Sequence, residues 1–156
     1  MSEQLKHRPV IVYVDMDNVL VDFKSGMDKQ EPGILKEYEG HVDDIPGIFA
    51  AMEPMPGAVE AMRTLNGKFD LYILSTAPWN NPSAWADKLE WVKRYLGDIF
   101  YKRLILSHHK DLLKGDYLID DRGSHGASEF GGEWIRFGSE RFLDWSAVCT
   151  YLEEKL

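Results

Sequence analysis

The sequence predicts an α/β protein built on a parallel sheet, and three observations lead to this fold class. Five short apolar runs are typical of strands, at residues 10–14, 71–74, 104–106, 117–119 and 134–137. The first run is apolar throughout, as expected for a strand that is covered on both faces. Helical patterns lie between several of the runs, which is the signature of the βαβ units of a parallel sheet.

Between the first strand and residue 53 the pattern is helical only. Two short amphipathic helices are expected here, with apolar faces formed by Leu20, Phe23 and Met27 and by Ile45, Ile48, Phe49 and Met52. We interpret residues 19–52 as a small helical insert that lies over the carboxyl ends of the strands, where open α/β sheets bind ligands. The chain has no linker or internal repeat, so residues 1–156 are expected to form one domain with this insert.

Three longer helices are expected in the rest of the chain. Pro56 and Gly57 precede one over residues 58–65, Ser83 precedes a second that ends at Gly97, and Asp144 is placed to cap a third. The predicted apolar faces of the second and third are Trp85, Leu89, Val92 and Leu96, and Trp145, Val148, Cys149 and Leu152.

Composition and charge exclude several classes of function. Lys and Arg total 18 against 26 Asp and Glu, a net charge of −8, which repels long polyanions and disfavours a nucleic-acid polymer as partner. No apolar stretch approaches the roughly 18 residues that span a bilayer, and the polar first residues lack the apolar region of a signal peptide, so no membrane partner is expected. Cys149 is the only cysteine, which favours a reducing, cytoplasmic location. The oligomeric state is left open, with a homodimer among the alternatives.

Pairs of carboxylates follow two of the predicted strands. Asp15 and Asp17 come directly after the first strand, and Asp120 and Asp121 end the fourth. If these strands are neighbours, four carboxyl groups converge at one edge of the sheet, and a set of oxygen ligands suits Mg²⁺. The alternative is a pair of solvated turns, which is how we interpret the further Asp pair at residues 43–44.

A hydroxyl group and an ammonium group are placed to join this edge. Ser75 and Thr76 end the second strand, and Lys110 and Lys114 lie just before the fourth. A turn residue and surface lysines are the ordinary interpretation, but one ammonium near four carboxylates would help to hold an anion. The Gly- and Ser-rich residues 122–132 are expected to form a mobile loop.

The ordered segments DMDNVLVDF, ILSTAPW and YLIDDR, the last preceded by Lys110, resemble the motifs of the haloacid-dehalogenase-like phosphohydrolases, and specifically of the 5'(3')-deoxyribonucleotidase family. MEPMPGAVEAM and WADKLEWVKRYLG extend the resemblance over most of residues 10–122. It implies a Rossmann-like three-layer parallel sheet with a small helical cap inserted after the first strand. One departure is Asn18, which stands where many members of the family have Gly.

The resemblance also implies the roles of the site residues. Asp15 would be the nucleophile, Asp17 the general acid and base, Thr76 the hydroxyl that binds the phosphoryl group, and Lys110 its cationic partner. Mg²⁺ would be held by the carboxylate of Asp15, the main-chain carbonyl of Asp17 and the carboxylate of Asp121. The remaining implied positions are Asp120 as a supporting partner of the metal ligands, Ser75 as the alternative hydroxyl, Ala77 next to Thr76, and Phe23, Phe49 and Trp79 as aromatic candidates for the substrate pocket.

The predicted function is therefore a magnesium-dependent phosphomonoesterase that acts on (deoxy)nucleoside monophosphates through an aspartyl-phosphate. One alternative is a phosphatase for another small phosphomonoester, such as a sugar phosphate. The other is a phosphoacceptor or binding module without turnover, which Asp17 argues against, because a module that only stores phosphate needs no acid for a leaving group.

Overall fold

A computed structural model describes residues 8–156, so the first seven residues of the expected domain lie outside the described part. Its centre is a five-stranded parallel sheet in the order β5-β4-β1-β6-β7. The strands are β1 (Ile11–Val14), β4 (Asp70–Ser75), β5 (Leu104–Leu106), β6 (Tyr117–Asp120) and β7 (Glu133–Arg136). All five predicted strands are confirmed, with boundaries that differ by one residue or less.

The central position of β1 explains its unbroken apolar sequence. Val12 and Val14 point into the larger hydrophobic core, whereas Tyr13 belongs to a smaller apolar cluster on the opposite face. Because side chains alternate along a strand, a strand that is buried on both faces must be apolar at every position.

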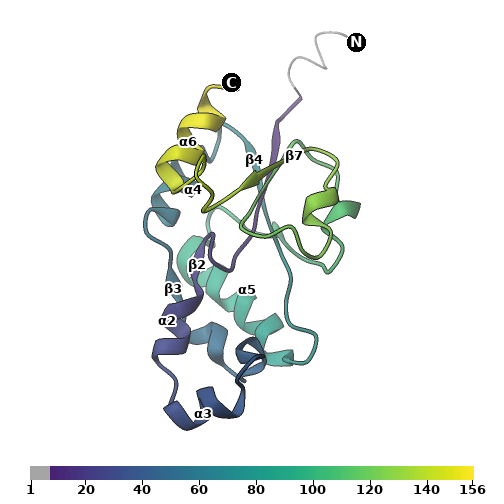
Figure 1. Ribbon diagram of the computed structural model, residues 1–156. Helices are drawn as coiled ribbons and strands as arrows, with labels where there is room; N and C mark the ends of the chain where they lie inside the picture. Colours follow the sequence, from purple (N-terminus) through teal and green to yellow (C-terminus); the bar gives the residue numbers. More distant parts are fainter. Residues whose placement is uncertain (1–7) are drawn as a thin grey trace.

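Three helices cover one face of the sheet: α4 (Ala58–Leu65), α5 (Pro82–Leu96) and α6 (Trp145–Glu153) (Figure 1). The other face is covered by two short 3-10 helices, η3 (Lys110–Leu112) and η4 (Ala127–Glu129), and by the side chain of Phe130. The segment that was expected to be a mobile loop therefore forms part of the packed third layer, because Ala127 and Phe130 are buried against the sheet.

The start and the buried face of α5 differ from the prediction. The helix begins at Pro82, whose fixed φ suits the first helical turn, so Ser83 lies inside the helix. Leu89 is 42% exposed. The buried residues of the helix are Ala84, Lys88, Trp91, Val92 and Leu96. Val92 and Leu96 are therefore buried as predicted, whereas in the first half of the helix Ala84 and Lys88 take the buried positions expected for Trp85 and Leu89.

The insert after β1 is a cap made of shorter pieces than the two predicted helices (Figure 1). They are β2 (Val21–Asp22), α2 (Phe23–Asp28), α3 (Pro32–Glu37), η1 (Val42–Asp44), η2 (Ile48–Ala51) and β3 (Glu53–Pro54). The prediction of one helix near residues 45–52 is wrong. Pro46 keeps Ile45 in an extended conformation, and Gly47 has a φ of +80°, so the chain makes two 3-10 turns instead.

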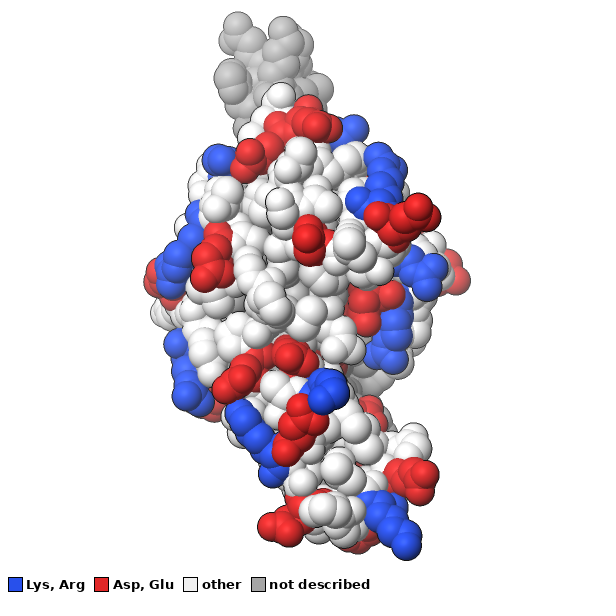
Figure 2. Space-filling view, turned by 60° about the vertical axis from the view of Figure 1, so that its left-hand side comes forward, with Lys and Arg blue, Asp and Glu red and all other residues white. Residues whose placement is uncertain are grey.

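The surface carries charges of both signs. On the face shown in Figure 2, Lys and Arg side chains are scattered among Asp and Glu and form no continuous basic area. None of the helices within residues 8–156 has the length and apolar character needed to cross a bilayer.

Candidate active site

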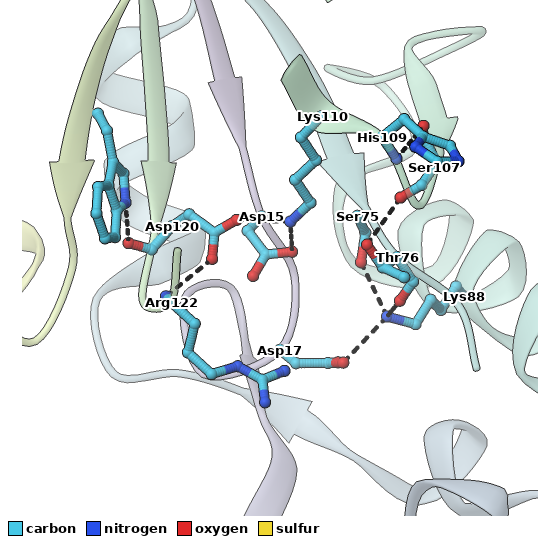
Figure 3. A network of polar contacts seen from close by, with 11 residues as sticks. Asp15, Asp17, Ser75, Thr76, Lys88, Ser107, His109, Lys110, Asp120 and Arg122 are labelled. Carbon is cyan, nitrogen blue, oxygen red and sulfur yellow. Dashed lines mark hydrogen bonds and ion pairs between the residues drawn. The ribbon is translucent and has the colours of Figure 1, made fainter. Parts of the chain in front are cut away.

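The pairing of β1 with β6 brings the two predicted aspartate pairs together. Val14 is in register with Ile119, and the main-chain N–H of Asp15 donates to the carbonyl of Ile119 over 2.9 Å. Asp15 and Asp120 therefore leave the sheet side by side at its carboxyl edge (Figure 3). The carboxylate cluster was predicted on the condition that these two strands are neighbours. They are, since β1 pairs with β6.

A tight turn after β1 places Asp17 at the same edge. The carbonyl of Met16 accepts hydrogen bonds from the N–H groups of three residues, Val19, Leu20 and Val21. Asn18 adopts the left-handed conformation with a φ of 62°, which Asn tolerates better than most residues other than Gly. This explains how Asn can stand at a position where many members of the resembled family have Gly.

Three carboxylates lie close enough to share a cation. Asp15, Asp120 and Asp121 each offer an oxygen, and these oxygens lie within 4.8 Å of one another. Both oxygens of Asp120 are engaged, one with Lys110 Nζ at 2.6 Å and the other with the main-chain N–H of Arg122 at 3.1 Å. Oδ1 of Asp121 is buried and has no hydrogen-bond partner among residues 8–156. The free oxygen of Asp121 and the all-oxygen donor set fit Mg²⁺.

Lys110 compensates part of the negative charge of this cluster. Its side chain is almost fully buried, and Nζ also donates to Oδ1 of Asp15 over 3.1 Å. Burial alone would lower the pKa of Lys110, but the charges of Asp15 and Asp120 outweigh burial and raise it. The lysine therefore stays charged and can face an anion.

Asp120, the last residue of β6, and Asp121, which follows it, both have a pKa above the ordinary value of a carboxyl group. Burial and the nearby charge of Asp15 raise the pKa of Asp120 to about 7, against the opposing effect of Lys110. The same two causes raise the pKa of Asp121, while Arg122 opposes them. Carboxylates held together in this way require either protons or a cation.

Asp17 faces a second lysine that sequence reasoning missed. Lys88, on α5, has no exposed surface, and its Nζ lies 3.2 Å from Oδ2 of Asp17. Burial raises the pKa of Asp17, and the charge of Asp15 adds to this effect, while Lys88 opposes it. A raised pKa is what a carboxyl group needs in order to carry a proton to a leaving group.

The two candidate hydroxyl groups have different surroundings. Thr76 lines the cavity at the carboxyl edge, and its hydroxyl donates to the carbonyl of Ser107 over 2.7 Å. Ser75 is 1% exposed, and its hydroxyl accepts a hydrogen bond from Lys88 over 2.9 Å. Thr76 is thus the hydroxyl that an entering ligand would meet, and Ser75 lies behind it.

A cavity of about 360 Å³ opens above these groups. Its walls combine the catalytic candidates with residues from the cap and from three loops: Asp15, Asp17, Asp43, Asp44, Thr76, Pro78, Trp79, Asn80, His108, Lys110, Asp120, Arg122, Ser124 and His125. The aspartate pair of the cap, which was interpreted as a solvated helix start, forms η1 and lines this cavity.

The aromatic candidates lie in three different environments. Trp79 is 78% exposed at the cavity wall, with its ring edge-on to His108. Phe23 lines an adjoining cavity of about 430 Å³ that shares Asp17, Asp43 and Arg122 with the first. Phe49 is buried, packs edge-on against Phe23 and lies under Lys88. Ala77 is fully buried next to Thr76.

Comparison with known proteins identifies the family of the chain. Residues 31–144 match the family described as "5' nucleotidase, deoxy (Pyrimidine), cytosolic type C protein". A protein of Vibrio phage KVP40 named "Putative 5'(3')-deoxyribonucleotidase" is 61% identical over 142 residues, which cover 91% of this chain and 84% of the relative. The human protein named "5'(3')-deoxyribonucleotidase, cytosolic type" is 30% identical over 156 residues, which cover 81% of this chain and 78% of the relative.

Solved structures with little sequence similarity share the fold. A haloacid-dehalogenase-type hydrolase from Bacillus subtilis, solved with bound magnesium, matches with a TM-score of 0.64 at 13% identity over 93% of this chain and 99% of that one. A hydrolase of the same type from Xanthomonas campestris matches with a TM-score of 0.61 at 12% identity over 94% and 91%. With the family match over most of the chain, these findings show that the chain is a hydrolase that belongs to the haloacid-dehalogenase-like 5'(3')-deoxyribonucleotidase family.

Proposed function

We propose that this protein is a magnesium-dependent phosphomonoesterase that releases phosphate from (deoxy)nucleoside monophosphates. The observation that carries the proposal is the meeting of Asp15, Lys110 and Thr76 at one cavity, next to a buried carboxylate oxygen of Asp121 that has no hydrogen-bond partner in the described part of the chain. A nucleophile, a cation, a hydroxyl and a metal ligand are the groups that phosphoryl transfer requires.

The phosphoryl group of the substrate would bind between Thr76 and Lys110. The hydroxyl of Thr76 would exchange its bond to Ser107 for a bond to a phosphoryl oxygen, and Lys110 would add a charged donor. The metal would be held by the carboxylates of Asp15 and Asp121 and the main-chain carbonyl of Asp17. When bound, Mg²⁺ neutralises part of the carboxylate charge and polarises a phosphoryl oxygen.

Asp15 would then attack phosphorus in line with the ester bond. Two unit negative charges about 4 Å apart repel each other by about 4 kcal/mol at an effective dielectric constant near 20, and the charge of Lys110, together with the metal, would offset this repulsion. The new bond joins an oxygen of Asp15 to phosphorus, the ester P–O bond breaks, and Asp17 gives its proton to the departing nucleoside oxygen.

Hydrolysis of the aspartyl-phosphate would complete the cycle. Asp17, now deprotonated, takes a proton from a water molecule whose oxygen attacks phosphorus. The bond from phosphorus to Asp15 breaks, inorganic phosphate leaves and both aspartates return to their initial states. A raised pKa of Asp17 supports this double role, because the group must be protonated when attack begins.

The nucleoside would lie between the cap and the loop after β4. Trp79 on the core side and Phe23 on the cap side offer aromatic surfaces near the phosphate position. Phe49 supports the ring of Phe23 from the buried side, and Ala77 lies fully buried next to Thr76. Stacking on such rings would favour nucleotides over sugar phosphates.

A substrate panel tests the proposal. We expect phosphate release from deoxynucleoside and nucleoside monophosphates with Mg²⁺, and loss of release when the metal is chelated or when Asp15 is replaced by Asn. Asp28→Asn, on the exposed end of α2, serves as the matched control. Faster turnover of sugar phosphates than of nucleotides would assign the cavity to the alternative substrate class.

We also infer a cytoplasmic location. Support comes from the single cysteine and from the human relative, which is named as the cytosolic type. Fractionation of cells that produce the protein would show it in the cytosolic fraction.

A further inference from the structure

We propose that Lys88 is a positioning residue that orients the carboxyl group of Asp17 for proton transfer to the leaving group. The inference rests on the proposed function of Asp17. It assigns a role to a lysine that lies within the segment WADKLEWVKRYLG, to which the resemblance gave no role, and that stands outside the wall of the active-site cavity.

The ammonium of Lys88 is fully bound by oxygens. Its side chain comes from the middle of α5, is completely buried, and donates to Oδ2 of Asp17 at 3.2 Å, to Oγ of Ser75 at 2.9 Å and to the carbonyl of Thr76 at 3.1 Å. An ammonium has three donors, so all of them are used. The ring of Phe49 lies 4.7 Å from Nζ and closes the remaining side.

This arrangement separates the two oxygens of Asp17. Lys88 holds Oδ2, whereas Oδ1 is buried and has no hydrogen-bond partner among residues 8–156. Oδ1 is therefore the atom left to carry and deliver a proton. Figure 3 shows Lys88 and Arg122 on opposite sides of Asp17, so without Lys88 the carboxylate would be free to turn toward Arg122.

Lys88 is not placed to bind phosphate itself. Its three donors are occupied, and it does not line the cavity, whereas Lys110 lines the cavity and faces the carboxylate cluster. Ser75 and Thr76 anchor Lys88 to the end of β4. The network thus connects Asp17 to a rigid strand and, through Phe49, to the cap.

The burial of a lysine without any exposed surface also calls for a reason other than stability. A buried ion pair is weak evidence for stability, because the desolvation of two charges offsets their attraction. Lys88→Met removes only one partner and leaves the buried carboxyl group of Asp17 without its cation, so we expect a lowered thermal midpoint. The measurements that separate a positioning role from a structural one are therefore made on the folded variant, well below its thermal midpoint.

The experiment compares leaving groups. We expect Lys88→Met to lower kcat/KM for a nucleoside monophosphate about 10- to 100-fold with little change in KM, since general acid catalysis contributes about 10²–10⁴-fold. With an aryl phosphate, whose leaving group needs no proton, we expect a loss below about threefold. Lys93→Met, on the exposed side of α5, is the control and should match the wild type with both substrates.

A double-mutant cycle supplies the second readout. If Lys88 acts through Asp17, the single-turnover release of nucleoside by Asp17→Asn should hardly change when Lys88→Met is added. Equal losses with both leaving groups, a rise in KM alone, or additive losses in the cycle would overturn the proposal. Lys88→Gln, which keeps a donor without the charge, carries the same test if the Met variant does not fold.

The two proposals fail in different ways. A wild-type protein that releases no phosphate from nucleotides but hydrolyses another alkyl phosphate refutes the substrate class, and the role of Lys88 is then measured with that alkyl phosphate. Normal nucleotidase activity with additive losses refutes the role of Lys88 alone.

Discussion

Nζ of Lys110 lies 2.6 Å from Oδ2 of Asp120, and both side chains are almost completely buried. This contact places a cation under the carboxylate cluster. The lysine reaches it because its main-chain N–H donates to the carbonyl of His125, at 2.7 Å, which fixes the start of η3 against the segment after β6. Gly126, with a φ of +83°, allows that segment to approach Asp111 more closely than a side chain would permit.

Removal of this lysine should destabilise the protein as well as inactivate it. Lys110→Met leaves buried carboxylates without their cation, which costs about 3–5 kcal/mol for a broken buried pair. Denaturant unfolding with a metal chelator at pH 8 measures this loss. Lys114→Met, an exposed lysine four residues on, is the control. An unchanged unfolding free energy in Lys110→Met would contradict the interpretation of the contact.

The raised pKa of Asp120 predicts a specific dependence of stability on pH. Between pH values of about 4 and 7 the native state binds a proton at Asp120 that the unfolded state has lost, because the pKa is about 7 in the fold and 3.8 in the unfolded chain. In the metal-free protein the stabilisation from this group is therefore present at low pH and lost as the pH rises toward 7. The unfolding free energy of the wild type, minus that of Asp120→Asn, should therefore decrease as the pH rises across this interval.

Added Mg²⁺ should stabilise the protein most at pH values where these carboxyl groups have lost their protons. Protons and the metal compete for the carboxylates, so added Mg²⁺ should raise the thermal midpoint more at pH 8 than at pH 5. Scans at several magnesium concentrations measure the effect. Asp121→Asn should reduce the increase at pH 8, and a full increase in that variant would place the metal elsewhere.

Asp17→Asn and Asp15→Asn should differ in their effect on turnover, because the first removes the proton donor and the second removes the nucleophile. We expect a loss of about 100-fold or more in turnover of a nucleoside monophosphate, because an amide can neither donate nor accept the required proton. Asp15→Asn should abolish turnover with every substrate, since no nucleophile remains. Full activity of Asp17→Asn with a nucleotide would refute the role of general acid.

Asn81 should control the position of the cap over the cavity. Its buried amide donates to the carbonyls of Asp43 and Ile45, each over 2.9 Å. Asn81→Ala should cost about 1–3 kcal/mol of unfolding free energy, since the buried bond to Ile45 and the partly buried bond to Asp43 are both lost. KM should rise more than kcat falls, because η1 forms a wall of the cavity. Asn66→Ala, at an exposed position, is the control.

Trp79 provides a test of the pocket for the nucleoside. Its ring is exposed at the cavity wall, and the loss of stacking on one aromatic ring costs about 1–3 kcal/mol in other base complexes. Trp79→Ala should therefore raise KM for a nucleotide about tenfold and leave KM for a small sugar phosphate nearly unchanged. Leu143→Ala, another exposed apolar residue, is the control. Equal effects on both substrates would argue against base stacking.

The sequence alone determined the sheet and most of the chemistry at its edge. Short runs such as residues 10–14 and 117–119 carry their own strand signal, and the residues that directly follow a parallel strand must emerge at its carboxyl end. For this reason Asp15, Thr76 and Asp120 could be assigned to one edge before the strand order was known. The register of β1 with β6 then brought the two aspartate pairs together.

Only the tertiary structure decided which groups face each other across that edge. Lys88 looks like a surface residue in a helical pattern, and its partners, Asp17 and Ser75, are 71 and 13 residues away in the sequence. The break at Pro46 and Gly47 turns an expected helix into two 3-10 turns. Asp43 then lies in the cavity wall, where its carbonyl accepts a hydrogen bond from the distant Asn81. Local patterns encode local conformation, whereas the partner of a buried charge depends on packing between segments that are distant in the sequence.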